Sequence, residues 1–187
     1  SDLLADELQK ETNSAALDEG AMFNAVTGVA SRVKGSYAVV SLIAGYGLLA
    51  FRDPFGIRPL CIGRIDTPQG PEWMVASESV ALEGLGFTFV RDVNPGEAIY
   101  IDLDGNFYAR QCVANAVLTP CIFEYVYMAR PDSTIDGVTV YNVRMRMGDY
   151  LAEKIRKETN VDEIDVVMPI PDSSRPAAMQ VAKNLGV

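Results

Sequence analysis

The 187-residue chain contains no histidine, and this excludes several common kinds of site. Without an imidazole, the chain has no Ser–His or Cys–His catalytic pair and no histidine-ligated metal of its own. The three cysteines, Cys61, Cys112 and Cys121, are odd in number and widely spaced, so they form neither a disulfide framework nor a CxxC metal pair. This usage is typical of a reducing compartment, and we expect a cytoplasmic protein whose chemistry uses other residue types or other chain segments.

Basic residues and long apolar runs are also scarce. Lysine and arginine total 16 against 25 acidic residues, and the net charge of −9 argues against a nucleic-acid-binding surface, so any phosphate site must be local. The longest apolar stretch, residues 39–51, is interrupted by Ser41, Gly45 and Gly47 and is shorter than the ~18 to 20 residues that span a bilayer. We therefore expect core strands there, and neither membrane attachment nor a secretion signal.

The first part of the chain has the pattern of a helix followed by antiparallel sheet. Apolar residues recur at helical spacing from Ala21 onward, and Gly35 is the expected C-cap of this helix. Short β-type runs follow, separated by turn sequences such as Asn94-Pro95-Gly96. The predicted strands are 37–43, 48–52, 58–64, 73–76, 87–90, 97–103 and 106–111.

The pattern changes after a connector at residues 113–120. Apolar residues every four positions predict a long helix over 141–157, the β-branched run 164–170 predicts a strand, and 177–185 predicts another helix. A strand, a loop and a helix in this order are the opening of an α/β domain.

The loop Pro171-Asp172-Ser173-Ser174 is the strongest candidate site, because there the carboxyl end of the predicted strand meets a helix N-terminus. Such junctions bind anions and phosphates. Asp172 and the two hydroxyls could also hold a hydrated Mg²⁺ that a polyphosphate carries. The alternative is that Ser173 or Ser174 only caps the helix, with Pro176 in its first turn.

Three other segments admit both a functional and a structural interpretation. Residues 51–59 could bind an anion, or form a tight loop held by internal arginine–aspartate pairing. Residues 76–79 place capping residues before a helix. The alternating aromatics of 123–133 fit a strand and turn at a domain interface, where ligand sites often form. Cys121 could be a cluster thiolate, although a lone cysteine is usually a small buried hydrophobe.

Five motifs follow one another along the chain. They are Phe51-Arg-Asp-Pro-Phe-Gly-Ile-Arg-Pro-Leu60, Val75-Ala-Ser-Glu-Ser-Val-Ala-Leu82, Arg91-Asp-Val-Asn-Pro-Gly-Glu97, Glu124-Tyr-Val-Tyr-Met-Ala-Arg-Pro-Asp-Ser133 and Ile164-Asp-Val-Val-Met-Pro-Ile-Pro-Asp-Ser-Ser174. In this order they closely resemble motifs of the amidophosphoribosyltransferase family, and the resemblance covers about Ala5 to Val187. Members of this family are glutamine-dependent enzymes that commit 5-phosphoribosyl 1-diphosphate (PRPP) to purine synthesis.

The resemblance implies an α+β and α/β fold with two partial domains. Residues 1–113 would be the C-terminal part of an αββα N-terminal-nucleophile (Ntn) sandwich of the class II glutamine amidotransferases. Residues 114–187 would be a linker and the start of a type I phosphoribosyltransferase α/β domain. In such enzymes an N-terminal cysteine attacks the glutamine amide, and the released ammonia displaces pyrophosphate from C1 of PRPP.

The same resemblance implies roles for a few residues of this chain. Asp172, Ser173 and Ser174 would bind PRPP or a nucleotide, with the Ser173 hydroxyl as a ligand to Mg²⁺. Asp2 would correspond to the glutamine-binding aspartate, although the family spaces it further from Ala5-Asp-Glu-Leu8. Tyr127 matches a tyrosine on the ammonia route between the two sites.

Cofactors, partners and missing parts follow from the resemblance as well. Cys121 matches the first cysteine of a 4Fe–4S cluster, but members without a cluster also carry it, so iron is not assigned. The partners would be glutamine, PRPP and purine nucleotides as feedback inhibitors, in a homodimer or homotetramer of the whole protein. The nucleophilic cysteine and the paired-aspartate PRPP loop would lie outside these residues, so we expect the chain alone to catalyse neither half reaction.

Three other classes of protein remain open. A non-catalytic module that binds purine nucleotides would need only the loop at Asp172–Ser174. A different class II glutamine amidotransferase would share the sandwich, but it should lack the Pro-Ile-Pro-Asp-Ser-Ser segment. A purely structural protein would give no reason for a strand–loop–helix junction of the phosphate-binding type.

Overall fold

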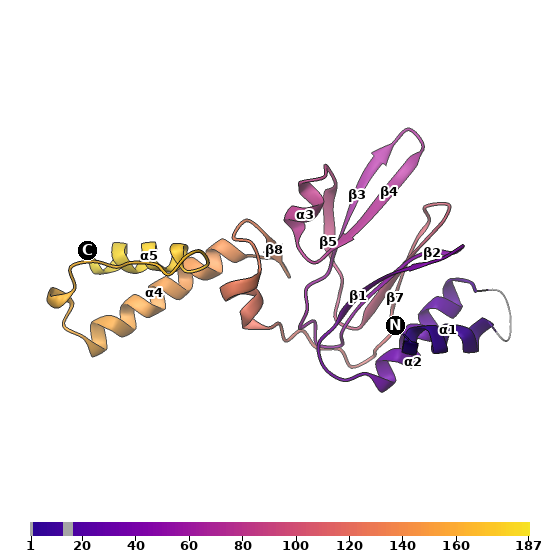
Figure 1. Cartoon of the computed structure of the whole chain (residues 1–187), viewed down its shortest axis with the longest axis horizontal. Helices are drawn as coiled ribbons and strands as arrows, with labels where there is room; N and C mark the ends of the chain where they lie inside the picture. The colour runs from indigo at the N-terminus through magenta and orange to yellow at the C-terminus, as the bar shows by residue number, and fades with distance from the viewer. Residues whose placement is uncertain (1, 13–16) are drawn as a thin grey trace. The chain divides into compact units, whose positions relative to one another are not determined.

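A computed structural model describes residues 2–12 and 17–187, and the chain divides into two compact units (Figure 1). The first unit ends at Pro120, and the second runs from Cys121 to Val187. The first unit holds most of the β-structure, and the second is mainly helical.

Two helices open the first unit. Helix α1 (Asp2–Thr12) was not predicted, although Leu4 and Leu8 share one of its faces. Helix α2 (Glu19–Arg32) begins where the side chain of Asp18 accepts a hydrogen bond of 2.8 Å from the N–H of Ala21. It ends before the expected cap, because the backbone of Val33 is already extended. Gly35 lies instead in the loop that follows, where it has a φ of +106°.

Four antiparallel strands form the larger sheet. They are β1 (Ala38–Ile43), β2 (Gly47–Arg52), β6 (Glu97–Asp102) and β7 (Phe107–Gln111), in the order β1-β2-β6-β7. All four correspond to predicted strands, and each differs from its prediction by one residue at one end. At the β1–β2 turn a Cβ on Gly47 would clash with the backbone of Ile101, so the close approach of β6 requires glycine there.

Three further strands form a second sheet in the order β4-β3-β5. These are β3 (Cys61–Thr67), β4 (Gly70–Ala76) and β5 (Thr88–Asp92). The short helix α3 (Ser79–Glu83) packs closely on this sheet, since a Cβ added at Gly63 of β3 would lie 3.2 Å from the Leu82 side chain. Glu78 occupies the N-cap position of α3 without a side-chain cap hydrogen bond, so the capping expected from this segment is not seen at that residue.

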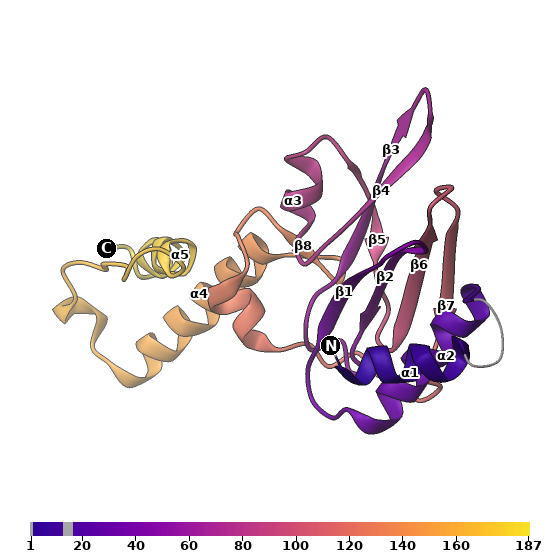
Figure 2. The same cartoon turned by 45° about the vertical axis from the view of Figure 1, so that its right-hand side comes forward.

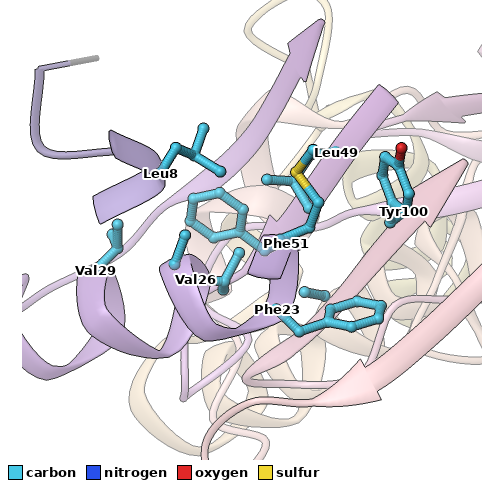
Figure 3. Packing of buried hydrophobic residues seen from close by; sticks show 10 residues of the cluster. Leu8, Phe23, Val26, Val29, Leu49, Phe51 and Tyr100 are labelled. Carbon is cyan, nitrogen blue, oxygen red and sulfur yellow. The ribbon is translucent and has the colours of Figure 1, made fainter. Parts of the chain in front are cut away.

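The main core lies between the two N-terminal helices and the larger sheet (Figure 2). Its side chains come from α1, α2, β2 and β6 and point into one layer (Figure 3). Ala50 and Ile99 on the opposite face of the same sheet pack with Ile62 of β3 in a second cluster. The first unit therefore has the layer order helices, sheet, sheet and short helix. Figure 3 labels seven residues of the main core: Leu8, Phe23, Val26, Val29, Leu49, Phe51 and Tyr100.

The second unit is built around one long helix, α4 (Val140–Glu158), on which α5 (Arg175–Leu185) packs. A π-helical turn, η1 (Glu124–Met128), and a hairpin of β8 (Thr134–Ile135) and β9 (Val138–Thr139) precede α4. A single 3₁₀ turn, η2 (Val161–Glu163), follows it.

Two predictions for the second unit are wrong. Residues 164–170 run in no regular structure and pair with no strand among the described residues, and Val166, Met168 and Ile170 are exposed. A β-branched run becomes a strand only where a partner supplies the ladder. The alternating aromatics near Tyr125 form η1 and not a strand: the consecutive residues Glu124 and Tyr125 are both buried, whereas Phe123 and Tyr127 are exposed. No helix among the described residues is both long and apolar enough to cross a bilayer.

Candidate functional site

The predicted phosphate loop lies at the start of α5. Asp172 has an exposed side chain, and Ser173 and Ser174 are half-buried. The carboxylate of Asp172 forms an ion pair of 2.7 Å with the guanidinium of Arg175, three residues later. Since both partners are more than half exposed, this pair is screened by water and contributes little to stability.

The capping interpretation of this loop is only half right. Ser174 does occupy the N-cap position of α5, and Pro176 lies in the first turn, as predicted. However, the Ser174 side chain accepts no hydrogen bond from the helix, and its hydroxyl donates to the carbonyl oxygen of Ile170. This helix start lacks side-chain capping, but the N–H of Arg175 already donates to the carbonyl oxygen of Asp172 and Pro176 has no N–H. An anion would therefore meet the helix dipole and the serine hydroxyls more than free amide groups.

The donor set of this loop suits magnesium. Asp172 offers a carboxylate and the two serines offer hydroxyls, and Mg²⁺ takes oxygen ligands. The described residues contain no cluster of three or more acidic, cysteine or histidine side chains that would hold a metal by themselves. The loop therefore fits an ion that arrives with a phosphate ligand and keeps part of its water, which is how Mg²⁺ usually binds.

The donor set for an iron–sulfur cluster is incomplete. A 4Fe–4S cluster takes four thiolates, and the sequence has three cysteines. Cys61 is buried in β3, where burial raises the pKa of its thiol to about 12, and Cys112 also belongs to the first unit. Cys121 is the one cysteine of the second unit, so these 187 residues cannot complete such a cluster by themselves.

Tyr127 lies on η1 with 70% of its surface exposed. Its turn is fastened to α4 by Arg144, a buried residue that the sequence analysis did not single out. Arg144 donates from Nε to the carbonyl oxygen of Tyr125 and from Nη2 to that of Ala129, both at 2.8 Å. A signal was present in the sequence, because Arg144 occupies a position on the apolar face of the predicted helix.

Polar residues that join α4 to α5 were also missed. The carboxylate of Asp149 accepts hydrogen bonds from Gln180 at 2.5 Å and from Asn184 at 2.7 Å. These donors hold the pKa of Asp149 below its usual value. The arrangement joins the two helices that support the loop.

The other candidate residues, Asp2 and Tyr127, belong to other elements than this loop. Asp2 is the exposed first residue of α1 and belongs to the first unit. The structure thus brings Asp172, Ser173 and Ser174 together in one loop, and Tyr127 lies on a separate turn of the same unit.

The arginine-rich segment 51–59 is a structural loop. The Asp53 carboxylate accepts hydrogen bonds from the backbone N–H groups of Phe55, Ile57 and Arg58 at 2.9 to 3.2 Å. The buried Arg52 side chain donates to backbone carbonyl oxygens, including that of Val93 at 2.8 Å. Hydrogen bonds to the backbone therefore hold the Asp53 carboxylate and the Arg52 guanidinium in this segment.

Three known proteins with similar sequences share the name amidophosphoribosyltransferase. It is 54% identical over 166 residues to the amidophosphoribosyltransferase of Pseudomonas aeruginosa, covering 89% of this chain and 33% of that protein. It is 52% identical over 171 residues to the Escherichia coli protein of the same name, covering 91% and 34%. The Saccharomyces cerevisiae amidophosphoribosyltransferase is 44% identical over 188 residues, covering 98% and 37%. No family model matches the chain.

Solved structures agree with the sequence relatives. The glutamine PRPP amidotransferase of Bacillus subtilis, complexed with ADP and GMP, superposes with a TM-score of 0.79 at 32% identity. That match covers 98% of this chain and 37% of the Bacillus chain. The chain spans about a third of the length of the relatives it matches, and its fold is a mixed α/β one like theirs. On this similarity along nearly all of its residues, the chain belongs to the amidophosphoribosyltransferase family.

Proposed function

We propose that this chain is part of an amidophosphoribosyltransferase that makes 5-phosphoribosylamine for purine synthesis. The whole protein would convert glutamine, PRPP and water into 5-phosphoribosylamine, glutamate and pyrophosphate. The observation that carries the proposal is the loop Asp172–Ser174 at the start of α5, within a chain 54% identical to an enzyme of that name. The whole protein would be a cytoplasmic enzyme that works as a homodimer or homotetramer.

Each of the two units would belong to a different catalytic domain. Residues 1–113 would belong to the glutaminase domain of the Ntn type, and the layered sheets of the first unit support this assignment. Residues 114–187 would open the phosphoribosyltransferase domain. Asp2 would contact glutamine in the first domain, and Tyr127 would lie on the route of ammonia to the second.

The loop Asp172–Ser174 would bind the phosphate groups of PRPP. The N-terminus of α5 favours negative charge, since the positive end of the helix dipole lies there. Ser173 and Asp172 would hold the Mg²⁺ that PRPP carries, and the bound ion would offset the charge of the diphosphate leaving group. The ion pair of Asp172 with Arg175 keeps the carboxylate at the mouth of the loop.

The same loop would accept purine nucleotides as feedback inhibitors. The Bacillus relative was solved with ADP and GMP, which carry the same kind of phosphate groups as PRPP. A nucleotide at this loop would compete with PRPP for the helix N-terminus.

The proposal is tested by two activities of the longer polypeptide that contains these residues. With glutamine and PRPP it should release glutamate and pyrophosphate in equal amounts, whereas the 187-residue chain alone should release neither above the blank rate. Asp172→Ala and Ser173→Ala should each lower pyrophosphate release by at least about tenfold, because they remove groups that act on the diphosphate. Glutamate release should be retained.

The matched control is Asp165→Ala, which removes an exposed acidic residue of the same unit. It should leave both activities unchanged. A longer polypeptide that releases no pyrophosphate with glutamine or with ammonia would disprove the proposed function.

A further inference from the structure

Arg144 is a buried cation that neither proposed site uses directly. It lies in the second turn of α4, and only 3% of it is exposed. Burying a guanidinium is unfavourable unless its N–H groups find acceptors. Its bonds to the carbonyl oxygens of Tyr125 and Ala129 supply two of these acceptors, so the side chain is fixed on η1.

The acceptors belong to an unusual turn. In η1 the N–H of Ala129 donates to the carbonyl oxygen of Glu124 at 2.9 Å, which closes a π-helical turn. Such turns are rare and occur often at functional sites. The last carbonyls of a helical turn have no partner inside it, and Arg144 supplies one from α4. The conformation of η1 therefore depends on Arg144.

The two sides of η1 differ sharply in exposure. Tyr125 and Ala129 are buried, and they pack with Ile135 and Val140. Tyr127 is 70% exposed on the other side of the turn. Residues neighbouring Tyr127 on this outer side are also exposed and apolar; they are Ile122, Phe123, Val126 and Met128. The anchored side of the turn thus determines where Tyr127 is presented.

One face of α4 connects this turn to the phosphate loop. Its buried residues recur every four positions and include Arg144 and Gly148. Arg144 holds η1, while Gly148 lets α5 approach closely, with Ala177 and Gln180 against it. Since α5 begins directly after Asp172–Ser174, a single helix sets both segments of the second unit.

We propose that Arg144 is a positioning residue for the transfer of ammonia between the two sites. It touches neither substrate, and it acts by holding η1 so that Tyr127 keeps the place that the ammonia route requires. This inference rests on the proposed function, which assigns Tyr127 to that route. A displaced turn would let ammonia escape to water before it reaches PRPP.

The test compares nitrogen donors in the longer polypeptide that contains these residues. Arg144→Met keeps much of the side-chain length but removes both hydrogen bonds. With glutamine as donor, we expect its pyrophosphate release to fall about tenfold, the scale of loss that a small misplacement produces. Glutamate release, and pyrophosphate release with ammonium chloride, should stay within about twofold of the unsubstituted protein, because Arg144 contacts neither reacting centre.

Two variants control for a purely structural effect. Arg144→Lys keeps the charge and one donor, and we expect it to restore part of the coupling between glutamate and pyrophosphate release. Arg146→Met removes an exposed arginine two residues along the same helix, and it should leave the coupling at one to one.

The outcomes separate the two proposals. Equal release of glutamate and pyrophosphate by Arg144→Met, or a parallel loss of all three activities, would overturn the role of Arg144. If Arg144→Met does not fold, Arg144→Lys decides, and full coupling in that variant would likewise overturn it. If the unsubstituted polypeptide uses neither nitrogen donor, the proposed function itself fails and this inference fails with it.

Discussion

Gly148 on α4 and Ala177 on α5 approach so closely that no side chain fits between them. A Cβ built on Gly148 would lie 2.6 Å from the carbonyl oxygen of Ala177 and 2.8 Å from the Cβ of Gln180. Backbone cannot move aside as a flexible side chain can. The packing of the two helices of the second unit therefore depends on this glycine.

Gly148→Ala should destabilise the second unit. Alanine in place of glycine normally stabilises a helix interior by up to about 1 kcal/mol. Here the added methyl group overpacks the contact, and we expect a net loss of about 1 to 3 kcal/mol in the free energy of unfolding. Urea denaturation followed by circular dichroism measures it. Arg146→Ala on the exposed side of α4 is the control, and a Gly148→Ala variant as stable as this control would contradict the prediction.

Asp53→Ala should destabilise the first unit. Asp53 is fully buried, and its carboxylate accepts hydrogen bonds from four backbone N–H groups. Removing it leaves these part-buried donors without their acceptor, and a fully buried donor left unsatisfied costs about 1 to 3 kcal/mol, which is the upper limit for each. The unfolding midpoint in urea should fall clearly. Asp66→Ala, which removes an exposed carboxylate that pairs with Arg64, should change it little, and similar midpoints for both variants would refute this account.

The stability of the first unit should fall at alkaline pH. Burial, with a smaller contribution from Asp92, raises the pKa of the Cys61 thiol from 9.0 to about 12. The thiol ionises more easily in the unfolded chain, so its contribution is complete below pH 9 and is lost as the pH rises towards 12. Burial raises the pKa of Tyr37 and Tyr100 in the same direction.

The alkaline loss can be assigned by comparing urea midpoints at about pH 8 and about pH 11, on either side of the unfolded thiol's pKa. Cys61→Ala should make the difference between the two urea midpoints smaller. The difference that remains should come from Tyr37 and Tyr100. Cys112→Ala is a weaker control, because burial also raises the pKa of the Cys112 thiol. An unchanged difference in Cys61→Ala would show that Cys61 does not contribute.

The 187-residue chain should bind no iron–sulfur cluster. A 4Fe–4S cluster takes four thiolates, and the chain has three cysteines in two separate units. Reconstitution with iron and sulfide under anaerobic conditions should give no absorbance band of a protein-bound cluster after desalting. A retained band with about four irons per chain would disprove this expectation.

The sequence predicted the elements whose signal is local. Strands β1, β2, β6 and β7 alternate or run apolar between turn residues, and each predicted strand differs from the structure by one position at one end. Such strands find their partners within the same unit. The apolar run 164–170 carries an equally strong signal, yet it pairs with no strand among the described residues. Strand propensity alone could not reveal that difference.

Contacts between distant residues were the part that could not be predicted. The loop Asp172–Ser174 was found because strand, loop and helix patterns follow one another in the sequence. Arg144 was missed because its role depends on carbonyl groups of Tyr125 and Ala129, 19 and 15 residues earlier, and no local pattern marks such acceptors. Gly148 was missed for the same reason, since only the path of α5 shows that a methyl group would not fit.

Strand β1 has one further consequence for the behaviour of the chain. It lies at an edge of the larger sheet, and it contains no charged residue and no proline. The N–H of Asp53 donates to the carbonyl oxygen of Tyr37, so by the alternation of an antiparallel ladder the backbone groups of Ala38, Val40 and Leu42 point away from β2. Sheet edges in soluble proteins are usually protected by charge or proline. An extended apolar peptide would find a matching row of donors and acceptors at β1, and self-association of the chain would begin there.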